Sequence, residues 1–324
     1  MDVYRLFKLM SDRSSHNKRI AKNTLFLYLR MGLVLVVSLF STRVVLQALD
    51  IEDYGINNVV SGFVTMFAFL NTSMSNGVQR FYNFSLGRKN GYSIKDVYNT
   101  ALQIQAILAV TLLVPLETFG MWYIHTQMVI PIDRFAAAQW VFQFSVLSLV
   151  LLVLQIPYSA AIMAYEKMDY YAYLSIFDVL AKLGIAYIIK YTTFDKLILY
   201  GALNMLVSLI CFFLYYGYAK SHFQDLKSDF IIRKQLFKPM LYFSGWNGFG
   251  SFAYMIKSQG LNMLLNVFFG PVVNAARGVS NMAMSAIQGF QSNIVIAFRP
   301  QLIQSYATGD NERVLKLFYN LSKV

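Results

Sequence analysis

The chain has 324 residues, of which 57% are hydrophobic and only 14% are charged, and its mean hydropathy is +0.47. Soluble domains carry about 25% charged and about 45–50% apolar residues, so this composition excludes an ordinary soluble protein. The single cysteine, Cys211, also excludes an internal disulfide and a cysteine-based metal site.

Eight apolar windows follow one another along the chain, each close to the roughly 20 residues that cross a bilayer as a helix. They cover residues 23–43, 54–76, 97–121, 139–163, 171–190, 197–219, 240–261 and 277–298, and a ninth begins near Val314. Residues 1–22 are interpreted as a basic amphipathic segment on the cytoplasmic membrane surface, not as a cleavable signal peptide. We therefore predict an all-α, polytopic membrane helix bundle with eight transmembrane helices and the start of a ninth.

The net charge of +12 is concentrated in alternate loops. The N-terminal segment and the connections around Arg80, Lys167, Lys220 and Arg299 are rich in Lys and Arg, whereas the opposite loops hold few. Cytoplasmic loops of membrane proteins collect basic residues, so the N-terminus is predicted to be cytoplasmic. Topology and anionic lipid explain the basic excess, and nucleic acid is not expected as a partner.

Two stretches of the chain are similar to each other in sequence. LQALDIEDYG is followed by a span and QRFYNFSLGRKNGYSIKDVYN, and LNVFFGPVVN is followed by a span and FRPQLIQSYATGDNERVLKLFYN. A repeat of six spans gives parallel lobes, with residues 23–219 as the first lobe, 220–239 as a cytoplasmic linker and 240–324 as a partial second lobe. Chance similarity between two membrane hairpins is the alternative.

The stretch NAARGVSNMAMSAIQGFQSNIVIAFRPQLIQSYATGD (274–310) and the motif ALDIEDYG around Asp50, Tyr54 and Gly55 resemble Wzx-type oligosaccharide (O-antigen) flippases. These flippases belong to the MOP (multidrug/oligosaccharidyl-lipid/polysaccharide) exporter superfamily, together with MATE drug exporters and lipid II flippases. The resemblance implies twelve or more spans in two six-helix lobes around a central cavity, so the second lobe is expected to be incomplete here.

The resemblance also implies a location and partners. The location is the bacterial cytoplasmic (inner) membrane, and the cargo is a lipid-linked oligosaccharide for surface polysaccharide or lipopolysaccharide biosynthesis. The implied partners are membrane lipids, a polysaccharide polymerase and a chain-length regulator.

Charged side chains inside the predicted spans are the first candidates for a site, because a charge at mid-bilayer costs at least about 2.5–3.5 kcal/mol. Arg30, Lys182, Lys257 and Arg277 are predicted to line a cationic cavity that holds the diphosphate of a lipid carrier. Snorkelling to the headgroups is the alternative for Arg30, and anchoring at the outer end of its span is the alternative for Arg277. Asp178 is the candidate for coupling to H⁺ or Na⁺, and a structural ion pair with Lys182 is its alternative.

Neutral polar residues are concentrated in the second and eighth windows, which are equivalent in the proposed repeat. Candidates for contacts with sugar hydroxyls are Asn71, Asn76, Gln79, Gln288 and Gln291. Hydrogen bonds that hold helices together are the other interpretation.

Three functions compete on these features. The first is a flippase that works by alternating access, and the second is a MATE-like drug or cation exporter, which would favour acidic cavity residues. The third is an integral membrane glycan polymerase or transferase, which needs a polar catalytic loop. The loop with Glu117, His125, Asp133 and Arg134 shows no recognisable catalytic spacing, so we expect no enzyme. The sequence has no P-loop motif, and neither a cofactor nor a metal is expected.

Overall fold

The computed structural model describes the backbone of residues 3–87, 92–126, 128, 130–226 and 234–322. Side chains are described in the same ranges except at residues 3–19, 21, 51, 63, 65, 68, 234, 255–256, 258–283, 285–286 and 290. Every regular element in these ranges is helical, which confirms the predicted all-α class.

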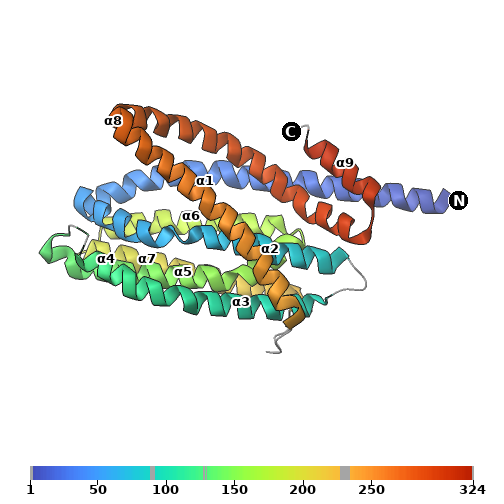
Figure 1. Cartoon of the computed structure of the whole chain (residues 1–324), viewed down its shortest axis with the longest axis horizontal. Helices are drawn as coiled ribbons and strands as arrows, with labels where there is room; N and C mark the ends of the chain where they lie inside the picture. The colour runs from blue at the N-terminus through green and yellow to red at the C-terminus, as the bar shows by residue number, and fades with distance from the viewer. Residues whose placement is uncertain (1–2, 88–91, 127, 129, 227–233, 323–324) are drawn as a thin grey trace.

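The bundle is built from long helices that run roughly side by side (Figure 1). The helices are α1 (Val3–Thr65), α2 (Ala68–Gly87), α3 (Ile94–Pro115), α4 (Met121–Thr126), α5 (Phe135–Ala164), α6 (Met168–Lys190), α7 (Lys196–His222), α8 (Lys234–Thr308) and α9 (Asn311–Leu321). A π-helical turn, Leu116–Gly120, follows Pro115 and joins α3 to α4, and a 3-10 turn, Ile132–Arg134, precedes α5.

Two of these helices reverse direction. α1 turns back at Asp50, whose φ of 65° and ψ of 168° are not helical, so the ALDIEDYG motif forms a sharp corner. α8 is drawn as two legs that meet at the upper left of Figure 1, and its second leg runs back along α1. The predicted seventh and eighth windows therefore lie in one helical run.

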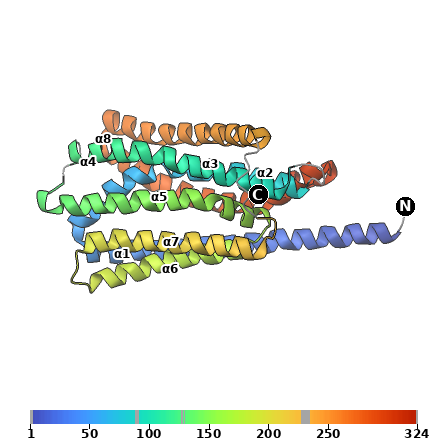
Figure 2. The ribbon, with the colours of Figure 1, turned by 90° about the horizontal axis from the view of Figure 1, so that it is seen from below.

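The segment predicted to lie on the membrane surface is part of α1. The helix begins at Val3 and continues into the first apolar window, and its N-terminal end projects beyond the rest of the bundle in Figure 2. Residues 3–22 and the first span therefore share one helix.

Five helical segments in the described part of the chain are long and apolar enough to cross a membrane: Lys22–Asp50, Ile94–Thr126, Ile132–Ala164, Met168–Lys190 and Lys196–His222. The predicted second, seventh and eighth windows lie in α1, α2 and α8, and the count of eight spans stays a prediction.

The outer surface of this bundle carries many large apolar side chains, and its interior holds several polar side chains beside an apolar core. Large apolar side chains such as Val36 and Val110 are exposed, whereas Gln79, Asn83 and Gln105 are buried. Broad exposed apolar surface marks contact with membrane. The chain is a multi-pass membrane protein.

Three apolar clusters hold the helices together. Val44, Ile185 and Val207 belong to a cluster that joins α1, α6 and α7. A second cluster, which includes Phe142, joins α1, α3 and α5, and a third, which includes Tyr82, joins α2, α3, α5, α7 and α8. The inner faces of α1, α2, α5, α6 and α7 are thereby fixed around a common interior.

Three charged residues form a clamp at the end of the bundle where α1 reverses. The Arg134 guanidinium donates to both carboxylate oxygens of Asp53, and its Nη1 donates to Asp195 Oδ2 at 2.7 Å. Asp195 also caps α7, because its Oδ1 accepts from the backbone N–H groups of Leu197 and Ile198 at 3.0 Å each. The clamp gives Asp53, the sixth residue of the ALDIEDYG motif, a structural role.

The first prediction concerns this clamp. Arg134→Ala leaves Asp53 unpaired with a side chain only 14% exposed. We expect a loss of about 1–2 kcal/mol of stability, between the values for surface and for buried pairs. Thermal unfolding of the purified protein in detergent measures the loss. Arg43→Ala, which removes an exposed arginine from α1, is the control, and equal melting temperatures of the two variants would contradict the clamp's role.

Candidate functional site

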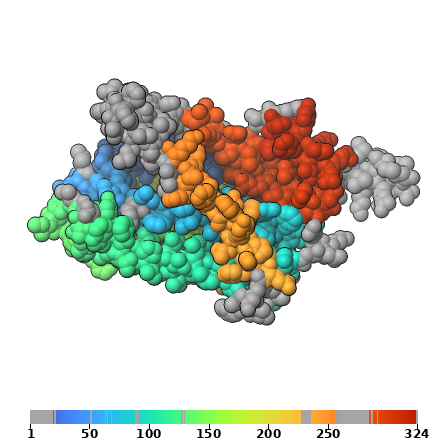
Figure 3. Space-filling model, in the orientation of Figure 1, coloured from blue at the N-terminus to red at the C-terminus, as the bar shows by residue number. Residues whose placement is uncertain are grey.

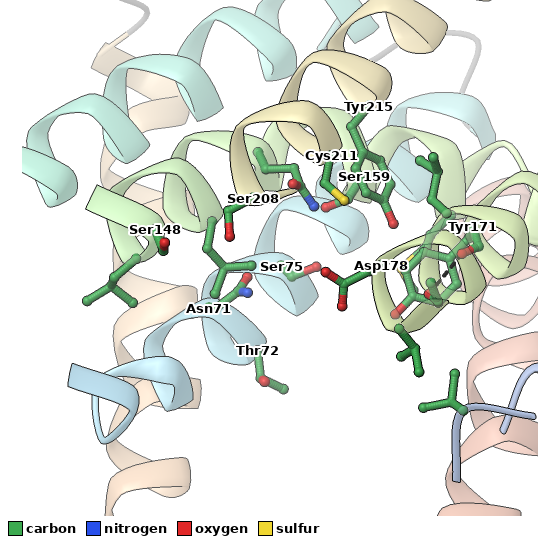
Figure 4. Close-up of a pocket in the computed structure, with 18 of the residues that line it drawn as sticks. Asn71, Thr72, Ser75, Ser148, Ser159, Tyr171, Asp178, Ser208, Cys211 and Tyr215 are labelled. Atoms are coloured by element: carbon green, nitrogen blue, oxygen red, sulfur yellow. Dashed lines mark hydrogen bonds between the residues drawn. The ribbon is translucent and has the colours of Figure 1, made fainter. Parts of the chain in front are cut away.

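A cavity of about 680 Å³ lies among the helices. Its walls come from α1, α2, α5, α6 and α7, and the second leg of α8 adds Ile296 and Arg299. Figure 4 shows Asn71 and Ser75 of α2 and Asp178 of α6 directed toward the same space. The cavity therefore lies where the clusters of apolar residues leave the polar faces of several helices opposed.

Polar side chains follow the helical period on the walls. The lining polar residues are Asn71, Thr72, Ser75, Asn76 and Gln79 of α2, Ser145, Ser148, Gln155 and Ser159 of α5, Tyr171, Ser175, Asp178 and Lys182 of α6, and Ser208 of α7. Steps of three and four residues place each set on one helix face. Most of the residues that line the cavity are therefore polar, and apolar side chains lie among them.

The serines of the lining mostly donate to their own helix. Ser145 and Ser148 donate to the carbonyl oxygens four residues earlier at 2.8 Å, and Ser175 donates to Tyr171 O at 2.9 Å. A hydroxyl that donates along its helix still offers oxygen lone pairs. These serines can accept hydrogen bonds from a hydroxyl-rich ligand.

Arg30 reaches the cavity from α1. Its Nη1 lies 3.5 Å from Ser175 Oγ, and the guanidinium lies 5.0 Å from the centre of the Tyr171 ring. Its Nε is buried and has no hydrogen-bond partner among the described residues. The side chain thus points inward and keeps donor capacity, which is the arrangement expected of a lining residue and not of one that snorkels to the headgroups.

Lys182 and Asp178 also lie on the cavity wall, and they pair at 2.8 Å. Their side chains are 44% and 33% exposed. An ion pair with that access to solvent contributes about 0–1 kcal/mol, so a ligand or a proton can compete for either member. Both interpretations made from the sequence, a pair and a cavity position, describe the same geometry.

Arg299 lines the cavity, although the basic residues around it predict a cytoplasmic loop. α8 continues through Pro300 to Thr308, so Arg299 lies inside a helix, and its guanidinium donates to Asn76 Oδ1 on α2. The predicted window ended at residue 298 because the next residues are charged or helix-breaking. The continuation of the helix, which brings Arg299 beside α2, depends on packing that no single window contains.

Three other predicted site residues, all with described side chains, are not among the residues that line the cavity. Lys257, Gln288 and Gln291 are exposed and are not among its lining residues. The side chain of Arg277 lies outside the described residues. Of the predicted polar set, Asn71, Asn76 and Gln79 line the cavity, and the buried Gln79 amide nitrogen has no partner among the described residues.

The polar residues of α5 that line the cavity are not among the site residues predicted from the sequence. Ser145, Ser148, Gln155 and Ser159 are separated by three, seven and four residues, which is the spacing of one helix face. That periodicity inside an apolar span was the available signal. No group of three or more His, Cys, Asp or Glu side chains that could hold a metal occurs among the residues with described positions.

The arrangement of these helices is similar to that in several solved transporter structures. An outward-facing multidrug resistance MATE family transporter of the MOP superfamily matches over 95% of this chain and 69% of its own, with a TM-score of 0.76 and 12% sequence identity. The fold is that of the MATE transporters. No protein-family model and no curated protein matches the sequence.

Two further structures share the MATE fold with this chain. A MATE transporter from Vibrio cholerae, VcmN in a mutant form, matches over 94% of this chain and 69% of its own, with a TM-score of 0.72 and 13% identity. A MOP superfamily transporter from Pyrococcus furiosus, described as having a binding pocket of reverse polarity that suggests a different function, matches over 94% and 69%, with a TM-score of 0.70 and 12% identity.

Proposed function

We propose that this protein is a flippase that moves a diphosphate-lipid-linked oligosaccharide across the cytoplasmic membrane by alternating access. The observation that carries the proposal is the meeting of three cationic side chains, Arg30, Lys182 and Arg299, at one cavity inside a membrane bundle. They come from three different helices, and one carboxylate, Asp178, accompanies them. The cavity therefore keeps a positive excess.

The chemistry of the proposed cargo matches both parts of the lining. A diphosphate offers several anionic oxygens, which arginine binds in a bidentate manner and lysine binds as a compact charge. The glycan offers hydroxyl groups, for which the serine, asparagine and glutamine side chains of α2 and α5 provide acceptors and donors. We propose that the lipid tail stays in the bilayer during the movement of the head.

A MATE-like exporter of drugs or cations is the second candidate. It is favoured by the MATE fold of the solved neighbours and by the carboxylate of Asp178 at the cavity wall. The two candidates demand opposite charge in the cavity, so the sign of the transported headgroup separates them.

A reconstitution experiment tests the proposal. The purified chain is placed in liposomes that contain a short-chain, fluorescent, diphosphate-linked oligosaccharide, and an impermeant glycosidase is added outside. We expect the protected fraction of the glycan to fall faster than in protein-free liposomes, whereas a cationic dye trapped inside stays in place. Release of the dye without any change in glycan protection would replace the flippase by the cation exporter.

The second prediction concerns the coupling role of Asp178. Asp178→Asn removes the titratable carboxylate but leaves Lys182 on the wall, so head binding by the cations is retained. We expect the variant to equilibrate the glycolipid at the native rate without a gradient and to lose all acceleration by an imposed H⁺ or Na⁺ gradient. The liposome assay, run with and without each gradient, measures this.

Two comparisons control the Asp178 experiment. Asp178→Glu keeps a carboxylate and is expected to restore part of the gradient response. Glu52→Gln removes an exposed carboxylate from α1 and is expected to behave like the native chain. A full gradient response in Asp178→Asn would exclude this residue as the coupling site.

A further inference from the structure

A second cavity, of about 380 Å³, lies between α2 and the first leg of α8. It is lined by Arg80, Phe81, Phe84, Ser85, Tyr92, Pro239, Tyr242 and Phe243, none of which lines the central cavity. Figure 3 shows the first leg of α8 (orange) crossing α2 (cyan) on the near face of the molecule. Five of the eight lining side chains are aromatic, so the walls are largely apolar.

Arg80 is the charged residue among those that line this cavity. It is exposed, and its guanidinium lies 4.1 Å from the centre of the Phe243 ring and 5.8 Å from that of Phe84. No ion pair joins Arg80 to a carboxylate among the described residues. The two rings fix the position of the guanidinium, and its N–H groups keep the capacity to bind an anion.

The walls beside Arg80 are accessible. Tyr242 is 66% exposed, and Pro239 is exposed as well. The cavity lies toward the Gly87 end of α2, where the distribution of Lys and Arg predicts the cytoplasmic leaflet. At that predicted level we expect the exposed aromatic groove to face lipid, with Arg80 at the depth of the headgroups.

We propose that this groove binds an anionic phospholipid of the membrane, with the phosphate on Arg80 and an acyl chain along Phe84, Tyr242 and Phe243. The charge of Arg80 selects an anionic headgroup, and basic pockets between transmembrane helices on the cytoplasmic side are suited to such headgroups. The aromatic walls provide the apolar contact that a free phosphate ion would not use. The site is independent of the flippase proposal, because it shares no residue with the central cavity.

The groove has a consequence for the helices that form it. Arg80 and Phe84 belong to α2, whereas Tyr242 and Phe243 belong to the first leg of α8. A lipid that contacts both walls binds only while the two helices keep their present contact, so it stabilises that contact. Anionic lipid is therefore expected to favour the arrangement of α2 and α8 described above.

Tryptophan fluorescence provides the test. The chain has three tryptophans, and Trp246 lies one helical turn from Tyr242, with ring centroids 6.0 Å apart. Trp122→Phe and Trp140→Phe together leave Trp246 as the only tryptophan of the chain, and it is 59% exposed. This chain is placed in nanodiscs of zwitterionic phosphatidylcholine, to which brominated phosphatidylglycerol or brominated phosphatidylcholine is added, since bromine quenches a tryptophan that it contacts.

We expect brominated phosphatidylglycerol to quench Trp246 at a mole fraction about fivefold lower than brominated phosphatidylcholine does. One basic residue near a membrane surface attracts anionic lipid by about 1 kcal/mol, which corresponds to this ratio. Arg80→Gln is expected to bring this ratio to about one, and Arg80→Lys to keep most of it. Arg43→Gln, which removes an exposed arginine from α1, is the matched control and should keep the native ratio.

Three outcomes overturn the proposal. Equal quenching of the native Trp246 chain by both lipids would exclude selection of the headgroup, and an unchanged ratio in Arg80→Gln would place the selection elsewhere. Inorganic phosphate is added as a competitor, and displacement of the lipid at comparable concentration would assign the site to a free anion. Normal thermal unfolding of Arg80→Gln shows that the variant is folded.

Discussion

Replacing Arg299 with glutamine is expected to reduce the rate of glycolipid translocation by roughly 10- to 150-fold, since a charge-assisted hydrogen bond contributes about 1.5–3 kcal/mol. Arg299 lines the central cavity and donates to Asn76 of α2. Glutamine retains a donor for Asn76 but removes the charge and the paired N–H groups that bind a diphosphate. The liposome assay measures the rate, and Arg30→Gln is expected to lose activity to a similar extent.

Conservative and distant substitutions make this prediction specific. Arg299→Lys keeps the charge without the planar fork, and we expect an intermediate rate. Lys257→Gln removes an exposed lysine that does not line the cavity and is expected to keep the native rate. If the protein is a cation exporter, the arginine variants should transport a cationic drug better, because removal of cavity cations would strengthen binding of the drug. Unchanged glycolipid translocation in both arginine variants would contradict the flippase.

The crossing of α2 and α8 gives the largest expected effect on stability. A Cβ atom on Gly87 would lie 2.7 Å from the carbonyl oxygen of Gln304 and 2.8 Å from the Ala307 Cβ, so the backbone of α8 would have to move. Gly87→Val is expected to cost about 3 kcal/mol, at the upper end for overpacking. A lower melting temperature and a lower yield of folded protein in detergent are the measured results.

The contacts beside Gly87 would be disturbed as well. Gln301 donates to the buried Glu166 at 3.2 Å, and Gln304 donates to Ala164 O at 3.1 Å, so α8 is held to the α5–α6 connection at this end. Gly217→Ala on α7 is the control, because nothing lies within 4 Å of the added Cβ. Alanine is the better helix former by about 1 kcal/mol, so this variant should be at least as stable as the native chain. A native-like melting temperature for Gly87→Val would contradict the close crossing.

Much of the cavity was predictable residue by residue. Arg30, Asp178 and Lys182 were singled out because charge inside an apolar span is costly, and the structure brings all three to one cavity. Asn71 and Gln79 were singled out by polarity in the same way and also line it. Their functional roles stay predictions.

The positions of Lys257 and Arg299 differ from those that the sequence predicts, and one cause explains both differences. Lys257 lies in an apolar window like Arg30, yet its side chain is exposed. Arg299 was placed in a loop, yet it lines the cavity. A window measures the composition of its own segment, whereas the direction of a side chain depends on which face of that helix meets another helix.

The amino-acid sequence by itself determined that this chain lies in a membrane, that it is helical, and that few charges are tolerated among its spans, because hydrocarbon requires apolar helices whose backbone groups are satisfied internally. Only the tertiary structure decided which charges meet. Arg30, Lys182 and Arg299 are more than a hundred residues apart along the chain, and they share a cavity because α1, α6 and α8 pack with those faces inward. Packing also placed Arg80 at a second cavity, between α2 and α8, that shares no residue with the central one.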